Sequence, residues 1–350
     1  MDLPLTFHFQ GWNIQYNLLN SAERNPTATK QPKHVVFVHG TPWSSVVFQP
    51  LIETLLAKGS YQILVYDLPG YGQSQEYHRP GDPTQQTQAA SAAAATTTDF
   101  LGDTSVKFQA EALAALLSAV HLHPSKGNGN AGHSPSLPAI IAHDIAGAIV
   151  LRAHLLHGCD FASMLLMDTN AVLPWGDGFY KLVRSEPQTF VHLPPKIFEA
   201  VVRAVVQSAC FNPGVLKTGW EDRLTSPWID AQCESSSGGG GSEMRGEGER
   251  QRSFVRQIAQ ANDTDVAEML EGNMYEKVRC RVKVLWGEND TWIPKEKIER
   301  LIDMLGDKVK EVAFVPEAGH LVMLDQPGRV AVEVYDWLNQ PSEQSSAGDA

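Results

Sequence analysis

The sequence lacks any apolar run close to the ~18 residues that a membrane-spanning helix requires. Its N-terminus has no basic stretch followed by an apolar core, so we expect no signal peptide. Cysteine is scarce: the four residues show no Cys-x-x-Cys spacing, which argues against a structural zinc site. Scattered cysteines are typical of a reducing compartment, and we therefore expect a cytoplasmic location.

An excess of positive charge is also missing, since 28 Lys and Arg residues face 40 Asp and Glu residues and give a net charge of -12. This balance argues against nucleic acid and anionic membranes as partners. A Gly-rich segment, residues 127–132, matches G-x-G-x-x-G, but it follows a helical pattern and precedes a strand, the reverse of a dinucleotide site. We therefore expect a small-molecule substrate and no cofactor or metal. The sequence does not indicate the oligomeric state.

Short apolar runs alternate with helical patterns, which predicts an α/β fold with a mostly parallel sheet flanked by helices. Two strands are expected within residues 5–19, and further strands at 34–38, 62–66, 139–142, 163–167, 282–286 and 312–315. The expected helices outside the middle of the chain are 45–58, 106–121, 147–157, 295–305 and 328–338.

This alternation stops between residues 170 and 278, which we call the inserted segment. The pattern there is mostly helical and predicts a lid over an α/β core formed by residues 1–169 and 279–340. Polar and small residues dominate four further stretches, namely 79–99, 124–137, 233–252 and the tail 341–350. We expect these stretches to be flexible, because they bury too little apolar surface to offset the entropy lost on ordering.

Asp144 lies between an apolar run and a helical pattern, with small residues two positions before and after it, Ala142 and Ala146. A strand, a tight turn and a helix in this order are typical of a nucleophile elbow. A serine in this position attacks carbonyl carbon, whereas a carboxylate is suited to displacing a leaving group from saturated carbon. The product is an ester of the enzyme, which must then be hydrolysed. Helix capping is the simpler structural explanation of a lone aspartate.

Other motifs favour the chemical explanation, because they follow the remaining predicted strands in a fixed order. They are His39-Gly40-Thr41-Pro42, the Asp-x-x-Gly-x-Gly-x-Ser run of residues 67–74, the Gly-x-x-Asp-x-x-Ile-Pro run of residues 287–294, and Gly319-His320. With the Asp144 elbow, this set resembles the α/β-hydrolase superfamily, and within it the branch of epoxide hydrolases and haloalkane dehalogenases. The resemblance spans nearly the whole chain and implies an α/β-hydrolase fold with an inserted helical lid.

The resemblance also implies a role for each motif. Asp144 would be the nucleophile, His320 the base that activates water, and Asp290 the acid that orients His320. The backbone N–H groups of Thr41 and Ile145 would form the oxyanion hole. Independently of the resemblance, all of these residues follow predicted strands, and an open parallel sheet gathers reactive groups beyond the carboxyl ends of its strands.

Asp168 is an alternative acid, because it ends the strand at 163–167 and some dehalogenases of the resembled branch place their acid there. The context of Asp290 is the more characteristic one, and we favour it. Asp168 would then only cap a loop.

The residues that would identify the substrate fit neither branch completely. Dehalogenases commonly have Trp after the nucleophile, where this chain has Ile145. Fluoroacetate-type enzymes place arginines just after the nucleophile to hold a carboxylate, and residues 146–148 include none. Epoxide hydrolases use two lid tyrosines, and here Tyr180 is one candidate, whereas Tyr275 is expected to be a packing residue. Candidate substrate-binding residues are Trp43, Trp175 and Tyr180.

We therefore expect hydrolysis of a small, largely apolar and uncharged epoxide or alkyl halide. The alternatives are a ligand-binding member of the same fold with little or no turnover, and a hydrolase of another ester-like substrate. A serine-type esterase is disfavoured because no serine occupies the elbow.

Overall fold

A computed structural model describes residues 1–23, 31–79, 101–122, 137–176, 178–229 and 248–340. The segments predicted to be flexible, 79–99, 124–137 and 341–350, lie outside the described residues except for Arg79 and Leu137. In the described ranges, no helix is both long and apolar enough to cross a membrane.

The strands form one 8-stranded sheet in the order β1-β2-β4-β3-β5-β6-β7-β8. Their bounds are Leu5–Phe9 (β1), Trp12–Asn20 (β2), Lys33–Val38 (β3), Tyr61–Tyr66 (β4), Ala139–His143 (β5), Ser163–Met167 (β6), Arg281–Gly287 (β7) and Val309–Val315 (β8). The pairs β1–β2 and β2–β4 are antiparallel, and every other pair is parallel. The predicted α/β fold with a mostly parallel sheet is therefore confirmed.

Burial along the strands follows from their place in the sheet. Every residue of β5 and β6 is buried, because helices cover both faces of these central parallel strands. The edge strand β8 instead alternates between buried and exposed residues in its second half. Continuous apolar runs therefore mark the centre of the sheet, which carries the Asp144 turn.

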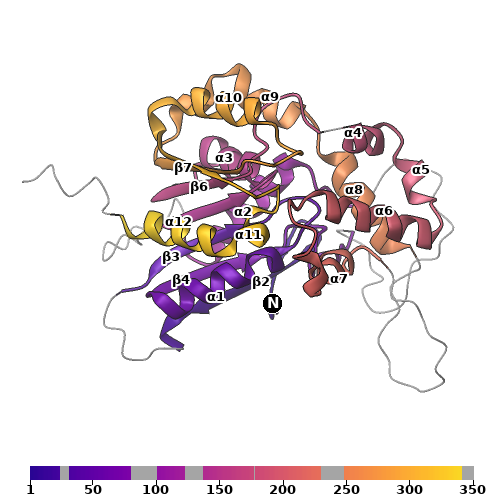
Figure 1. The fold of residues 1–350 in the computed structure, drawn as a ribbon, viewed down its shortest axis with the longest axis horizontal. Coiled ribbons are helices and arrows are strands. Elements are labelled where there is room, and N and C mark those ends of the chain that lie inside the picture. Colours follow the sequence, from indigo (N-terminus) through magenta and orange to yellow (C-terminus); the bar gives the residue numbers. More distant parts are fainter. Residues whose placement is uncertain (24–30, 80–100, 123–136, 177, 230–247, 341–350) are drawn as a thin grey trace, which may run out of the picture.

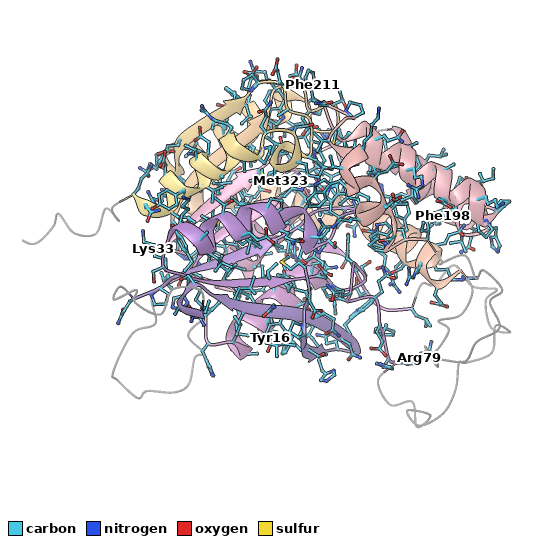
Figure 2. All side chains as sticks on the ribbon, turned by 60° about the horizontal axis from the view of Figure 1, so that its bottom comes forward. Tyr16, Lys33, Arg79, Phe198, Phe211 and Met323 are labelled. Carbon is cyan, nitrogen blue, oxygen red and sulfur yellow. The ribbon has the colours of Figure 1, made fainter. Side chains whose placement is uncertain are left out.

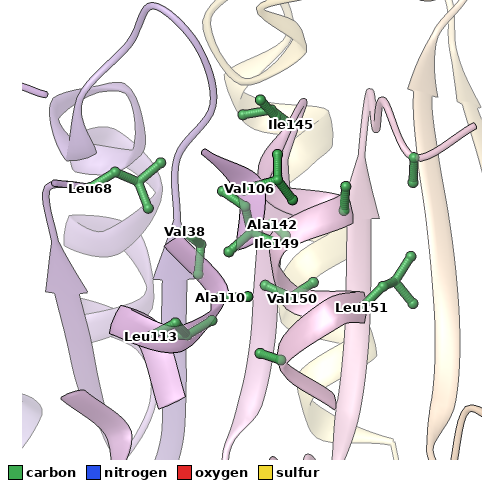
Figure 3. Close-up of a cluster of buried hydrophobic side chains, with 14 of the residues drawn as sticks. Val38, Leu68, Val106, Ala110, Leu113, Ala142, Ile145, Ile149, Val150 and Leu151 are labelled. Carbon is green, nitrogen blue, oxygen red and sulfur yellow. The ribbon is translucent and has the colours of Figure 1, made fainter. Parts of the chain in front are cut away.

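Helices lie on both faces of the sheet (Figure 1). The helices α1 and α12 pack on one face, and α2, α3 and α10 pack on the other. Their bounds are Gln49–Lys58 (α1), Val106–Ala119 (α2), Ala146–Leu156 (α3), Lys295–Leu305 (α10) and Pro327–Asn339 (α12). Figure 3 shows the second face, where Leu113 of α2 and Ile149 of α3 lie near Val38 and Ala142 of the sheet. Burying these side chains is the main stabilising contribution to the fold.

The inserted segment leaves the sheet after β6 and returns at β7. Its helices are α4 (Gly178–Ser185), α5 (Pro187–Val191), α6 (Pro195–Ser208), α7 (Trp220–Thr225), α8 (Glu249–Gln260) and α9 (Thr264–Glu271). In Figure 1, α4 to α8 gather beside one end of the sheet. Figure 2 labels Lys33, which begins β3, and Phe198 of α6 on opposite sides of the molecule. The carboxyl ends of the parallel strands therefore point toward the inserted segment.

The flexible stretch predicted within the inserted segment extends too far toward the C-terminus. The flexible stretch predicted at 233–252 lies outside the described residues only up to 247, because α8 begins at Glu249. Gln251 is buried, and its side-chain Nε2 donates to the carbonyls of Phe190 and Leu193. These contacts across the inserted segment hold the first turn of α8, and the local composition did not indicate them.

Candidate active site

Asp144 lies in a tight turn between β5 and α3. Its φ of +56° is in the left-handed region, which non-glycine residues rarely adopt and which is common at functional sites. Two backbone N–H groups, from Gly147 and Asn170, donate to its carbonyl at 3.0 and 3.1 Å. The turn is therefore held from the helix and from the loop after β6, and it has the geometry of a nucleophile elbow.

The loop after β3 packs directly against this turn. The backbone N–H of Thr41 donates to Asp144 Oδ2 at 2.9 Å. Only glycine fits at position 40, because a Cβ there would lie 2.5 Å from the Cβ of Asp144. The Thr41 side chain is fixed by a 2.7 Å hydrogen bond between its hydroxyl and that of Tyr71. The predicted oxyanion loop thus reaches the carboxylate through its backbone.

His320 lies between the two predicted carboxylates. Its Nδ1 is 2.9 Å from Asp290 Oδ2, and its Nε2 is 3.8 Å from Asp144 Oδ1. Among the described residues, Nε2 has no hydrogen-bond partner. Asp290 is itself held, because its Oδ1 accepts from the backbone N–H groups of Trp292 and Ile293 at 2.7 and 3.0 Å. The structure therefore brings together Asp144, His320 and Asp290, in an order that leaves Nε2 facing the nucleophile.

Burial and nearby charges shift the pKa of the reacting groups. Burial raises the pKa of Asp144 above its ordinary value, while His320 and the N–H groups of Thr41 and Ile145 act in the opposite direction. Burial also disfavours the charged form of His320, but the carboxylates of Asp290 and Asp144 outweigh it, so the pKa of His320 is raised. The two groups thus act on each other: a positive charge on His320 favours ionised Asp144, and a negative charge on Asp144 favours protonated His320.

Asp168, the alternative acid, takes a different place. Its Oδ1 accepts from the backbone N–H of Gly287 at 2.8 Å, and it ties the end of β6 to the end of β7. No hydrogen bond between Asp168 and His320 is present in the described part of the chain. Burial, and after it the charge of Asp290, raise the pKa of Asp168 well above its ordinary value. Asp168 thus bonds to the backbone of β7, and Asp290 is the carboxylate that pairs with His320.

A small cavity of about 50 Å³ opens at Asp144. Its wall comes from the strand-end loops and from the inserted segment: Thr41, Asp144, Ile145, Asn170, Trp175, Gly176, Tyr180, Arg184, Ile258, Ala261, Trp292 and Ile293. A single water occupies ~10–15 Å³ of this kind of volume. The cavity therefore accommodates a molecule of a few heavy atoms.

The structure separates the three residues predicted to bind substrate. Trp175 and Tyr180 line the cavity, but Trp43 does not. Trp43 stacks on Trp292, with ring centroids 5.6 Å apart, and Trp292 in turn stacks on His320 at 4.7 Å. Trp43 thus packs behind the wall and supports the ring that contacts His320, and its role in substrate binding stays a prediction.

Hydrogen-bond donors differ among the aromatic residues near the cavity. The indole N–H of Trp292 donates to Ser208 Oγ at 3.2 Å, and the hydroxyl of Tyr275 donates to the carbonyl of Ala171 at 2.6 Å. The indole Nε1 of Trp175 is buried and has no partner among the described residues. Trp175 is therefore a wall residue whose N–H no described residue uses, whereas Tyr275 is a packing residue, as expected.

Two residues near the site were not singled out from the sequence. His143 precedes the nucleophile, and its Nε2 lies 2.8 Å from the backbone carbonyl of His320, with the two rings 4.7 Å apart. Burial and the neighbouring His320 lower the pKa of His143 well below its ordinary value, so a neutral ring donates from Nε2. Arg184 of α4 is the other, and it lines the cavity. Its position depends on the packing of the inserted segment, which no local motif reveals.

The second motif of the set has a structural role. Asp67 accepts from the backbone N–H groups of Ser45 and Gln73, both at 2.7 Å, and Ser74 Oγ accepts from the N–H of Gln15 at 2.8 Å. This motif fixes loops that surround the site. Among the described residues, there is no group of three or more His, Cys, Asp or Glu side chains arranged to hold a metal ion.

Comparisons with known proteins agree with the fold. The model of the alpha/beta hydrolase family matches residues 35–334. Among solved structures, the chain is similar to an alpha/beta hydrolase fold protein from Burkholderia ambifaria, with 28% identity, a TM-score of 0.72, and coverage of 96% of this chain and 98% of that one.

More distant structures share the fold. They include a thermophilic esterase from Thermogutta terrifontis (16% identity, TM-score 0.63, coverage 95% and 98%) and an enol-lactonase from Burkholderia xenovorans LB400 (10% identity, TM-score 0.61, coverage 94% and 97%). No curated protein matches the chain significantly.

Proposed function

This chain belongs to the alpha/beta hydrolase family, and from that premise we propose that it is a hydrolase that forms a covalent ester between Asp144 and its substrate. The observation that carries the proposal is the carboxylate at the elbow, 3.8 Å from the Nε2 of a histidine that pairs with a second carboxylate. A carboxylate is suited to displacing a leaving group from saturated carbon. The epoxide hydrolase and haloalkane dehalogenase branch uses such a residue.

The first step needs an ionised Asp144. Protonated His320 and the N–H groups of Thr41 and Ile145 oppose the effect of burial on its pKa. Asp144 attacks carbon, the leaving group departs with the bonding electrons, and an ester joins Asp144 to the substrate. Loss of the Asp144 charge then lowers the pKa of His320, because that charge was one of those raising it. His320 therefore releases its proton to solvent more readily once the ester has formed, and the neutral ring can act as the base.

The second step is hydrolysis of the ester. His320 takes a proton from water through Nε2, and the water attacks the Asp144 carbonyl carbon. Asp290, bonded to Nδ1, holds the ring and stabilises the imidazolium. The N–H groups of Thr41 and Ile145 stabilise the tetrahedral oxyanion, and one such donor contributes on the order of 3 kcal/mol. Collapse of this intermediate releases an alcohol and regenerates Asp144.

The leaving group favours an alkyl halide as the first candidate substrate. The indole N–H of the wall residue Trp175 has no partner among the described residues, and N–H donors suit a departing halide. Epoxide opening is the second candidate, supported by the hydroxyl-bearing Tyr180 in the same wall. The cavity volume supports a substrate of a few heavy atoms in either case. Free thiols at Cys159, Cys210 and Cys280 support the proposed cytoplasmic location.

Single-turnover hydrolysis in heavy-oxygen water tests the proposal. Water attacks the ester carbonyl, so we expect one heavy oxygen in the peptide that contains Asp144 after one turnover in enzyme excess. Label found only in the product would show direct attack of water on the substrate and overturn the covalent mechanism. Absence of steady-state turnover with short alkyl halides, epoxides and esters would instead favour the ligand-binding alternative.

A further inference from the structure

Arg184 places a cationic side chain in the wall of the Asp144 cavity, where apolar residues such as Ile258, Ala261 and Ile293 also lie. We propose that the substrate carries a carboxylate and that Arg184 binds it while Asp144 attacks a neighbouring carbon. This inference rests on the proposed function of Asp144. It replaces the expectation of an uncharged substrate, which relied on the absence of arginine directly after the nucleophile.

The guanidinium of Arg184 is held in a fixed position. Its Nη1 donates to the carbonyl of Ala261 at 3.0 Å, and its Nη2 donates to the carbonyl of Trp175 at 2.9 Å. A guanidinium has five N–H donors, so these two bonds leave others for a ligand. The side chain is 19% exposed, and its ion pair with Asp263 is long, 3.9 Å, to a carboxylate that is half exposed. Such a pair offsets little of the positive charge.

Further cations lie around Arg184. Lys297 donates from Nζ to the carbonyl of Pro174, next to the cavity residue Trp175. Burial, and then the positive charge of Lys181, lower the pKa of Lys297; Arg184 adds to this effect, and the carboxylates of Asp263 and Asp144 oppose it. No ion pair in the described ranges includes Lys181 or Lys297. On this side of the cavity, Lys181, Arg184 and Lys297 thus outnumber the nearby carboxylate of Asp263, in a chain whose net charge is -12.

The negative charge of Asp144 explains why binding of a carboxylate substrate needs cations in the cavity wall. Ionised Asp144 repels a second carboxylate in the same small cavity, and this repulsion is strong where water is largely excluded. Fixed cations offset it, and a planar guanidinium also orients a carboxylate through paired hydrogen bonds. Two competing explanations exist for the same cations. In one, they only hold the helices of the inserted segment together through backbone carbonyls; in the other, their positive charge only keeps Asp144 ionised. Each predicts a different response to substitution.

Binding of propionate and its neutral isostere propionamide, measured by calorimetry, tests the site without any turnover. We expect the wild-type protein to bind propionate the more tightly, and Arg184→Gln to weaken propionate binding by about 100-fold while propionamide binding is unchanged. Arg184→Lys, which keeps the charge, should retain part of the preference. The matched control is Arg250→Gln, because Arg250 of α8 also holds two backbone carbonyls, of Ser226 and Ile229, away from the cavity. It should leave both affinities unchanged.

Turnover of chloroacetate and chloroacetamide then separates the explanations. Arg184→Gln should raise KM for chloroacetate by about 100-fold and affect the KM of chloroacetamide much less. An equal fall of kcat for both probes would assign the cations to ionisation of Asp144 and overturn the carboxylate site. Equal binding of propionate and propionamide by the wild-type protein, or the same loss in Arg184→Gln and Arg250→Gln, would also overturn it. Tight propionate binding lost only in Arg184→Gln, without hydrolysis of either probe, would retain the anion site and reject the proposed Asp144 chemistry.

Discussion

The two halves of the cavity wall differ in how they are built. The strand-end half carries Asp144, Asp290 and His320. Asp290 is fixed by backbone N–H groups of its own loop, and Asp144 by the N–H of Thr41 in the loop after the neighbouring strand β3. The other half comes from the inserted segment, where Arg184 of α4 is held by the carbonyls of Trp175, before α4, and Ala261, after α8. The reacting groups therefore depend on local turns, and the groups that meet the substrate depend on the packing of helices.

This difference predicts that substitutions in the strand-end half abolish reaction steps, whereas those in the other half change rates moderately. Asp144→Ala is the most severe case, because no ester can form without the carboxylate. We expect kcat to fall by about 10⁶-fold with the fold intact, as for removal of other covalent nucleophiles. Steady-state kinetics together with circular dichroism check this. Residual activity within tenfold of the wild type would remove Asp144 from the role of nucleophile.

His320→Gln separates the two steps within the strand-end half. The ester should form without the histidine, since attack by Asp144 needs no base, and it should then persist because no group activates water. Intact-mass measurement should detect the mass of the alkyl group on the variant, while kcat falls by at least about 10⁴-fold. An unmodified variant with normal turnover would exclude His320 from the mechanism.

Asp290→Asn and Asp168→Asn form a matched pair within the same half. An amide at Asp290 cannot stabilise the imidazolium and favours the wrong tautomer of His320, so we expect a loss of about 10⁴-fold in kcat. Asp168 bonds to Gly287 instead, and an amide oxygen accepts the same hydrogen bond. We therefore expect a loss below about tenfold for Asp168→Asn. The reverse ranking would move the acid to the end of β6.

Trp175→Phe tests the half that comes from the inserted segment. Phenylalanine keeps most of the apolar surface but removes the N–H that we assign to the leaving group, so the alkylation step should slow by about 10²-fold. Trp43→Phe is the control, because Trp43 packs behind Trp292 and does not line the cavity. Stopped-flow measurement of the first turnover distinguishes them. Similar losses in both variants would assign Trp175 to packing.

The pH dependence of ester hydrolysis reports the pKa of His320 and the effect of the Asp144 charge on it. Below the pKa of His320 the ring is protonated and cannot accept a proton, so hydrolysis should rise about tenfold per pH unit and level off above that pKa. In the ester, Asp144 no longer raises this pKa. The kinetic pKa should therefore lie below the value that nuclear magnetic resonance measures for His320 in the free enzyme. Equal values would show that Asp144 and His320 do not interact.

Much of the fold could be predicted from the sequence, because its signals are local. The strand Ser163–Met167 and the helix Lys295–Leu305 have the predicted bounds, and β5 is one residue longer than predicted. Apolar runs and helical periodicity follow directly from burial in a layered fold. The turn at Asp144 was equally readable, since small residues on both sides of it permit the tight approach of β5, α3 and the loop at Gly40.

Tertiary structure decided which side chains meet at the cavity. The sequence left Trp43 and Trp175 equivalent, and only the packing of Trp43 against Trp292 removes the first from the wall. Asp168 and Asp290 both follow strands, but only Asp290 lies within hydrogen-bonding distance of His320. Arg184 was not predicted at all. The physical reason is the same in each case: backbone patterns determine helices and strands, whereas the direction of a side chain in a cavity depends on contacts between residues far apart in sequence.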